Sequence, residues 1–393
     1  MPASPIRKLV PYADAAKARG IEIFHLNIGQ PDVHSPDAFW NAVQNCGLSV
    51  LEYSPSPGIT PLREKAAIYY KSIGIDVEAK HIIVTTAGSE ALSFAMMSTM
   101  NEGDEVIVPE PLYANYIGFS TAAGCVVKGI RTRIEDDFRL PSIRQFEAEL
   151  TPRTKAVLVC NPGNPTGAVY THDQMIELRD MCKANGLFLI GDEVYRDLNF
   201  TGKPITSVMQ LEGMEDQVIM IDSASKRFSL CGARIGFFVS RNPDLLDAAL
   251  RFAQARLSPP TLEQIGVLAA LDAPQSYFDG VREEFRARRD TLVARLSKMP
   301  GVVVPKIDGA FYATVRLPID DSDKFCQWLL DSFDHKGKTV MLAPATGFYS
   351  TPGAGLDEVR IAYVLSSERL NAAMDCLEAA LVAYPGRRQA VGV

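Results

Sequence analysis

The stretch SASKRFSLCGARIGF, residues 223–237, is the most informative part of this sequence. It places Lys226 among small and hydroxyl side chains and puts Arg234 eight residues later, where an apolar run resumes. A lysine with such neighbours suits a site where it folds back against a ligand. A partly desolvated amine can form a Schiff base with an aldehyde. The segment therefore predicts a covalent ligand site at Lys226.

Short apolar segments alternate with helical patterns on both sides of this stretch. We expect helices through residues 91–100, 114–123 and 171–185, between strands at 81–86, 105–108, 155–160, 187–193, 218–225 and 235–240. Such alternation predicts an α/β fold with a large, doubly wound, mostly parallel sheet, and it places ligands at the carboxyl ends of the strands.

The pattern changes after about residue 245, which predicts a second, smaller α+β domain. A helix is expected at 275–298, followed by strands near 301–316, 339–343 and 359–364 and a final helix. We assign residues 41–285 to the large domain, and residues 1–40 and 286–393 to the small one. The residues after Ala383 are expected to form a frayed end.

Composition excludes several classes of protein. The 393 residues carry a net charge of −7, and no basic run is dense enough to follow a nucleic-acid backbone. The sequence has neither a signal-peptide core nor an 18-residue apolar stretch, so no membrane span is expected. Seven scattered cysteines without a CxxC pair or a nearby histidine cluster indicate reduced thiols in the cytoplasm, with no disulfide framework and no metal site.

Two motifs supply what pyridoxal 5′-phosphate needs besides a lysine, namely a phosphate cup and an acid at the ring nitrogen. TTAGSEAL at 85–92 places residues 87–90 where a helix begins after a strand, and N–H groups there bind phosphate. A plain strand–turn–helix would look the same. In GDEVY at 191–195, Asp192 can pair with a protonated pyridine nitrogen and Tyr195 can reach the ring hydroxyl. Alternatively, Asp192 caps a following helix.

Other motifs fit the same kind of site, although each also has a structural explanation. NPGNPTG at 161–167 forms a rigid turn that can present the amide of Asn164 to a cofactor oxygen. Tyr113 comes just after a strand, where an aromatic ring can lie on a flat cofactor, and Tyr53 begins a turn-rich segment; half-buried packing explains either tyrosine as well. Arg360, in the apolar run EVRIAYV, suits a carboxylate or a structural salt bridge.

Taken together, residues 4–380 resemble the class I/II aminotransferases, pyridoxal-phosphate enzymes of fold type I, and among them the aspartate aminotransferases. The resemblance implies a ping-pong exchange between an amino acid and a 2-oxo acid, in a homodimer with shared active sites. It implies that Lys226 carries the cofactor and shuttles a proton, and that Asp192 keeps the ring nitrogen protonated.

The resemblance also assigns roles to the remaining residues. It implies that Tyr195 and Asn164 meet the ring hydroxyl and that Tyr113 stacks on the ring. The cofactor-binding set at the phosphate comprises Ala87, Gly88, Ser89, Glu90, Ser223, Ser225 and Arg234, with Tyr53 reaching in from the neighbouring subunit. Arg360, the backbone of Gly29 and the amide of Asn164 are implied to bind the substrate α-carboxylate.

One departure bears on the substrate. Many bacterial aspartate aminotransferases carry a lysine where this chain has Glu90, and an acid cannot bind a second carboxylate. Arg256, in FAQARLSPPTLEQ at 252–264, is the alternative cation for that carboxylate, or else a surface or interface arginine. We therefore predict aspartate or glutamate as donor and 2-oxoglutarate or oxaloacetate as acceptor.

Three alternatives to this function remain open at this point. One is an aminotransferase for neutral or aromatic amino acids. The second is another reaction on the same fold, such as that of a C–S lyase, a decarboxylase or an acyl-transferring synthase. The third is a non-catalytic regulator, which would carry a DNA-binding domain that we do not expect here.

Overall fold

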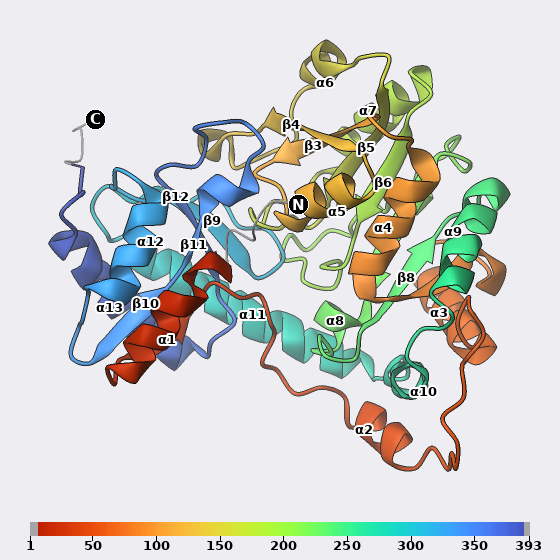
Figure 1. Cartoon of the computed structure of the whole chain (residues 1–393), viewed down its shortest axis with the longest axis horizontal. Coiled ribbons are helices and arrows are strands. Elements are labelled where there is room, and N and C mark those ends of the chain that lie inside the picture. Colours follow the sequence, from red (N-terminus) through yellow and green to blue (C-terminus); the bar gives the residue numbers. More distant parts are fainter. Residues whose placement is uncertain (1–6, 389–393) are drawn as a thin grey trace.

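The computed structural model describes residues 7–388 and is built around a seven-stranded sheet (Figure 1). The strands lie in the order β2-β8-β7-β6-β5-β3-β4. Only β8 runs antiparallel to its neighbours, and every other pair is parallel. The bounds are β2 Ile82–Thr86, β3 Glu105–Glu110, β4 Val126–Arg131, β5 Thr154–Cys160, β6 Phe188–Asp192, β7 Val218–Ser223 and β8 Ile235–Val239. This confirms the predicted α/β fold with a mostly parallel sheet.

Alternate residues of a strand point to opposite faces of the sheet, so each face of the large sheet presents side chains that can pack against helices. Helices cover both faces. In β5, Val157 and Val159 contribute to one core and Ala156 and Leu158 to the other. The first core packs against α3 (Thr60–Ser72), α6 (Ile143–Glu149), α7 (His172–Ala184) and α10 (Thr261–Ala270). The second packs against α4 (Ala87–Thr99), α5 (Asn115–Ala122) and α9 (Pro243–Ala255). The helix α2 (Asp37–Gln44) packs on α10.

A third core unites the N-terminal segment with the C-terminal part of the chain. In Figure 1 the red helix α1 (Val10–Ala18) lies among the blue C-terminal elements. β1 (Glu22–His25) pairs with β10 (Lys338–Met341), and β12 (Glu358–Ala362) pairs with β11 (Ala343–Pro344) and β9 (Tyr312–Arg316). The helices α12 (Ser322–Asp331) and α13 (Ser367–Ala383) complete this part.

The long helix α11 (Gln275–Leu296) connects the two parts of the chain. Near its start, Tyr277 and Phe278 pack on a core of the large sheet, whereas Phe285 and Leu292 are buried in the small-domain core. The expected boundary between residues 285 and 286 therefore falls inside one continuous helix. We propose α11 as the link between the two domains. Within residues 7–388, no helix is long and apolar enough to cross a membrane.

Several expected element bounds are wrong. Of the strand expected over residues 301–316, only β9 forms, since Pro305 and turns at Gly301 and at Ala310–Phe311 interrupt the rest. The strand expected at 218–225 ends at Ser223, which caps the short helix α8 (Ala224–Arg227). β4 was not predicted because it is a half-exposed edge strand without an apolar run.

The C-terminal end is docked and not frayed, as far as the structure describes it. Tyr384 is buried and its hydroxyl donates to Asp320 at 2.9 Å. The amide of Arg388 donates to the carbonyl of Pro318, also at 2.9 Å. Burial of the Tyr384 ring stabilises this docked arrangement, although the segment is otherwise polar and contains glycine. Residues 389–393 lie outside the described part of the chain.

Candidate active site

A cavity of about 360 Å³ lies at the carboxyl ends of the central strands, and residues of the N-terminal and C-terminal segments also line it. Its size falls in the range of small-molecule sites, and its position is the one expected for ligands of a doubly wound sheet. Most of the predicted site residues line it: Gly29, Ala87, Gly88, Ser89, Tyr113, Asn164, Asp192, Tyr195, Ser223, Ser225, Lys226, Arg234 and Arg360. Residues from distant segments therefore converge on one cavity.

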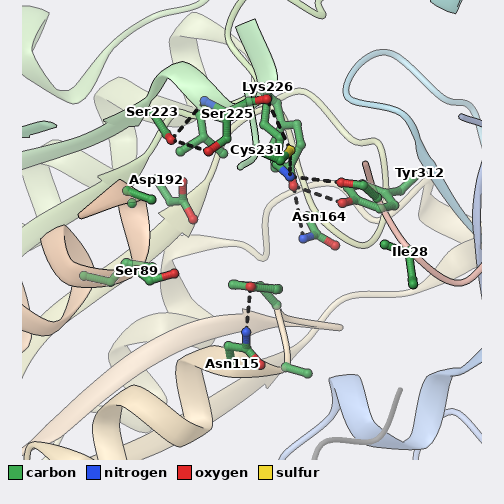
Figure 2. Close-up of a pocket in the computed structure, with 18 of the residues that line it drawn as sticks. Ile28, Ser89, Asn115, Asn164, Asp192, Ser223, Ser225, Lys226, Cys231 and Tyr312 are labelled. Carbon is green, nitrogen blue, oxygen red and sulfur yellow. Dashed lines mark hydrogen bonds between the residues drawn. The ribbon is translucent and has the colours of Figure 1, made fainter. Parts of the chain in front are cut away.

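Lys226 lies on the short helix α8 and points into this cavity (Figure 2). The helix begins because the hydroxyl of Ser223 accepts a hydrogen bond from the amide of Ser225 at 3.2 Å. The Nζ atom of Lys226 donates to the carbonyl oxygen of Gly29 at 2.9 Å and lies 3.5 Å from Sγ of Cys231. The N-terminal segment thus places a backbone oxygen directly beside the lysine.

Asp192 ends strand β6 with its side chain buried in the cavity wall. Its Oδ2 accepts a hydrogen bond of 2.6 Å from the hydroxyl of Tyr116, while Oδ1 has no hydrogen-bond partner among the described residues. Burial raises the pKa of this carboxyl to about 6, and the Tyr116 hydrogen bond opposes that rise. No helix begins after Asp192, so the capping alternative does not apply.

A cup for an anion forms where α4 begins. Ala87, Gly88 and Ser89 make the first turn of α4, and the hydroxyls of Ser223 and Ser225 lie 2.9 Å apart. Ala87 and Arg234 both adopt positive φ, and the Ala87 amide donates to the Arg234 carbonyl at 3.1 Å. This close approach needs Gly236, since a Cβ there would lie 2.3 Å from the carbonyl carbon of Ala87. Free N–H groups, hydroxyls and a guanidinium in one place favour a phosphate.

On the small-domain side of the cavity, polar side chains form a connected group. Arg360 is 2 % exposed; its Nη1 donates to Oδ1 of Asn164 at 3.1 Å and its Nη2 donates to the carbonyl of Asn27 at 2.6 Å. Its Nε has no partner among residues 7–388. The guanidinium lies over the ring of Tyr312 at 4.5 Å. A buried cation with a spare donor is suited to bind a carboxylate.

Three tyrosines complete the cavity wall. The hydroxyl of Tyr195 lies 3.4 Å from Nδ2 of Asn164 and 3.1 Å from the hydroxyl of Tyr312. Burial raises the pKa of Tyr195 well above its ordinary value, so this hydroxyl stays protonated and can donate. Tyr113 is held by a 2.7 Å hydrogen bond from Asn115, and its ring meets Tyr116 edge-on.

Three predicted residues do not line the cavity of this chain, and one of them needs correction. Glu90 was expected to bind the cofactor, but its Oε2 accepts from the amide of Thr86 at 2.8 Å and its Oε1 lies 3.2 Å from Nε of Arg256. Arg256 also donates to two backbone carbonyls. The acid is drawn to this cation and away from the cavity. Tyr53 is 80 % exposed and lies apart from the site.

Sequence reasoning missed several residues that line or support the cavity, among them Tyr116, Cys231, Tyr312 and Arg7. Tyr116 lies three residues after Tyr113 in the segment PLYANY that was already singled out. Cys231 lies within the segment 223–237 that was singled out. Tyr312 follows a glycine-containing turn and gave no local signal. Arg7 lies in a polar N-terminal segment that carries no motif.

Comparisons with known proteins identify the class of this protein. The family model described as aminotransferase class I and II matches residues 21–377. The aspartate aminotransferase of Bacillus subtilis (strain 168) is 30% identical over 374 residues, covering 92% of each chain. Aromatic-amino-acid aminotransferase 2 of Thermococcus litoralis is 31% identical over 388 residues, covering 96% of this chain and 95% of that one. The crystal structure of aspartate aminotransferase from Thermotoga maritima superposes with a TM-score of 0.88 at 31% identity, covering 97% and 98% of the two chains.

The chain belongs to the class I and II aminotransferases. It is an aminotransferase, an enzyme that transfers an amino group between an amino acid and a 2-oxo acid. The predicted family and enzyme class are thus confirmed.

Proposed function

We propose that this aminotransferase uses pyridoxal 5′-phosphate, held in the cavity around Lys226. The observation that carries the proposal is the buried Oδ1 of Asp192, which has no partner among the described residues although it lies in the same cavity as Lys226 (Figure 2). A buried carboxylate oxygen is costly unless a cation or donor meets it. A protonated pyridine nitrogen fits this requirement, and the cup at the start of α4 fits the phosphate.

We assign a separate role in the reaction to each of the main side chains of the cavity. When bound, the cofactor supplies an aldehyde that bonds to amines and a protonated ring that accepts electrons from the substrate Cα. Lys226 would hold the aldehyde and would serve as the base that moves the proton at the substrate Cα. Asp192 would keep the ring nitrogen protonated, and Tyr195 and Asn164 would donate to the ring oxygen.

The other residues orient the two ligands. Arg360 binds the substrate α-carboxylate through its spare donor, with the amide of Asn164 and the backbone of Gly29 beside it. Ser89, Ser223, Ser225 and Arg234, with the backbone at Ala87 and Gly88, would hold the phosphate, and Tyr113 would pack against the ring. Because one cavity serves both half-reactions, the first 2-oxo acid leaves before the second binds, and the kinetics are ping-pong.

Aspartate or glutamate is the proposed donor, with 2-oxoglutarate or oxaloacetate as acceptor. The names of the Bacillus and Thermotoga relatives support this choice. The Thermococcus relative is named for aromatic amino acids at a similar identity, so overall similarity does not decide between the two. The decision rests on which side chains of the cavity meet the substrate side chain.

The proposal includes a cytoplasmic homodimer with shared active sites. The segment 40–53 exposes five large apolar side chains, Trp40, Leu48, Val50, Leu51 and Tyr53, each at least 48 % exposed. Such a patch is typical of a surface that another protein covers. Tyr53 at the end of this patch would then reach the cavity of the partner. The seven free cysteines fit a reducing compartment.

Single half-reactions test the proposal. Purified protein loaded with pyridoxal phosphate is mixed with one amino acid at a time, while the absorbance of the lysine-bound cofactor and the released 2-oxo acid are measured. We expect loss of that absorbance together with one 2-oxo acid per site, and neither with Lys226→Ala. A borohydride-reducible adduct retained in Lys226→Ala, or no reaction with any amino acid, would contradict the proposal.

A further inference from the structure

The carboxylate of Glu110 connects the end of strand β3 to the loop 349–357, which follows in the C-terminal part of the chain. Glu110 is the last residue of β3 and is 0 % exposed. Its Oε2 accepts hydrogen bonds from the amide of Ser350 at 2.8 Å, from the hydroxyl of Ser350 at 3.0 Å and from the amide of Thr351 at 3.3 Å. Hydrogen bonds to a carboxylate are stronger than those between neutral groups, so this contact holds the two segments together.

The chain makes room for this contact at a cost. The other carboxylate oxygen of Glu110, Oε1, has no hydrogen-bond partner among residues 7–388. The neighbouring strand β4 carries Gly129 beside it, where a Cβ would lie 2.1 Å from Oε2 of Glu110 and 2.3 Å from Oγ of Ser350. The amide of Gly129 also donates to that hydroxyl at 3.0 Å. A buried oxygen without a partner lowers stability, so stability alone does not explain this acid.

The segment that contains the loop belongs to neither core of the large sheet. Its buried side chains form a small core of their own, with Ala114 packed beside it: Ala343, Ala345, Phe348, Tyr349 and Ala354. The amide of Leu112 donates to the carbonyl of Phe348 at 2.7 Å. Because so small a core buries little apolar surface, the polar contacts of Glu110 contribute much to the placement of the loop.

This segment in turn supports Arg360. Phe348 ends the short 3-10 helix η5 (Ala345–Phe348) and is fully buried, two residues before Ser350. The guanidinium of Arg360 lies over its ring, 4.9 Å from the centroid. A cation is attracted to the face of an aromatic ring, so the position of Phe348 helps to set the direction of the guanidinium. The direction of Arg360 therefore depends on a segment that Glu110 holds.

The other end of the contact is fixed without the carboxylate. The backbone of Glu110 pairs with Arg131 in the ladder between β3 and β4. The amide and the hydroxyl of Thr132 donate to the carbonyl oxygen of Glu110 at 2.8 Å and 2.9 Å. Tyr113, three residues further on, meets the ring of Tyr116 edge-on. Loss of the carboxylate should therefore displace the loop and Arg360 and leave the wall at Tyr113 in place.

We propose that Glu110 is a positioning residue for substrate binding, which holds the loop 349–357 so that Phe348 keeps the guanidinium of Arg360 directed at the substrate α-carboxylate. This inference rests on the proposed role of Arg360 and adds the residue that sets its direction. Every amino acid and 2-oxo acid substrate carries that carboxylate, so Glu110 affects all of them alike. Glu110 does not meet the reacting atoms, and its loss raises KM more than it lowers kcat.

The test compares Glu110→Ala and Glu110→Gln with wild type, all loaded with pyridoxal phosphate. It measures KM and kcat for each amino acid that the wild type accepts, the affinity for the cofactor, and hydrogen exchange of the amides in residues 345–357. The matched control is Glu105→Ala. Glu105 begins the same strand, is 6 % exposed, accepts from the hydroxyl of Thr151 at 2.7 Å and pairs with Arg153 at 3.2 Å. The control thus removes a buried, hydrogen-bonded acid at the far end of β3.

In Glu110→Ala we expect KM to rise about 10-fold for every reactive amino acid, the lower end of the value of one charge-assisted hydrogen bond, while kcat falls less than about 3-fold. The amides of Ser350 and Thr351 should exchange faster because they lose their acceptor. Glu110→Gln should recover part of both effects, since its amide oxygen can accept the same hydrogen bonds. Cofactor affinity in both variants, and KM and loop exchange in Glu105→Ala, should stay within about 2-fold of wild type.

Gly129→Ala is an independent variant, because its methyl group displaces the carboxylate without changing any charge. It should reproduce the rise in KM and the faster exchange even if Glu110→Ala does not fold. Faster loop exchange with an unchanged KM overturns the link to Arg360, and unchanged exchange overturns the role of the contact. An equal rise of KM in Glu105→Ala also overturns the proposal. These results leave the proposed function standing, because that function is tested on the wild type and on Lys226→Ala.

Discussion

Replacing Asp192 with asparagine should raise the unfolding free energy of the cofactor-free protein. The same substitution should strongly lower the single-turnover rate of the enzyme loaded with pyridoxal phosphate. Burial raises the pKa of this carboxyl from 3.8 to about 6 in the absence of the cofactor. Because one pKa unit corresponds to about 1.4 kcal/mol, holding the ionised carboxylate in the empty site costs the folded state about 3 kcal/mol near pH 8. Asparagine has the same shape and carries no charge, and its oxygen can still accept from Tyr116.

The sign of the pH dependence follows from the raised pKa. Between pH 3.8 and about 6 the folded protein holds a proton that the unfolded chain has released, so the stability contributed by Asp192 rises as the pH falls through 6. The penalty of about 3 kcal/mol at pH 8 therefore drops to about half at pH 5. Asp192→Asn should remove this part of the pH dependence.

Urea unfolding of the cofactor-free protein at pH 8 and pH 5, at fixed protomer concentration, measures the effect. The gain in unfolding free energy of Asp192→Asn over wild type should be about 3 kcal/mol at pH 8 and about half of that at pH 5. Asp14→Asn, an exposed acid on α1, controls for the change in net charge. An equal effect at both pH values, or a destabilised variant, would refute the reasoning.

The loaded enzyme should respond in the opposite direction. Among the described residues that line the cavity, no acid other than Asp192 could keep the ring nitrogen protonated, and the loss of a buried charge partner is worth several kcal/mol. The single-turnover rate of Asp192→Asn should therefore fall by about 10²- to 10³-fold, and cofactor affinity should also drop. A near-normal single-turnover rate would mean that Asp192 has no role at the ring.

Two further predictions concern the support of Lys226 and the assembly. Arg227, 3 % exposed beside Lys226, pairs with Asp222 at 2.8 Å and with Asp197 at 2.6 Å, so Arg227→Met should lower the unfolding free energy by about 3–5 kcal/mol. Partial recovery on adding Asp222→Asn is expected, and a loss below about 1 kcal/mol would show that the pair contributes little. Mixing Tyr53→Phe subunits with Lys226→Ala subunits should give heterodimers in which one active site carries neither substitution. The activity of the mixture should therefore exceed the mean activity of the two variant homodimers. Sedimentation that finds fully active monomers would rule out shared sites.

Much of the fold and of the candidate site could be predicted from the sequence. Strands such as 155–160 and 235–240 are short apolar runs, and their period and flanking turns are local properties of the chain. Asp192 at the end of β6 and Lys226 three residues after β7 are predictable for the same reason, since topology brings the carboxyl ends of parallel strands together. The order of these motifs was enough to indicate the family.

Only the tertiary structure decided which side chains pair across the chain. Tyr116 reaches Asp192 over 76 positions, and Lys226 meets the carbonyl of Gly29 over 197. No local pattern encodes either contact, because each depends on how helices pack on the sheet and how the N-terminal segment crosses the cavity. The same holds for Glu90, whose partner Arg256 is contributed by a distant helix end and turns the acid away from the site. Sequence determines which groups a chain carries, whereas packing determines which of them are already satisfied and which remain available to a ligand.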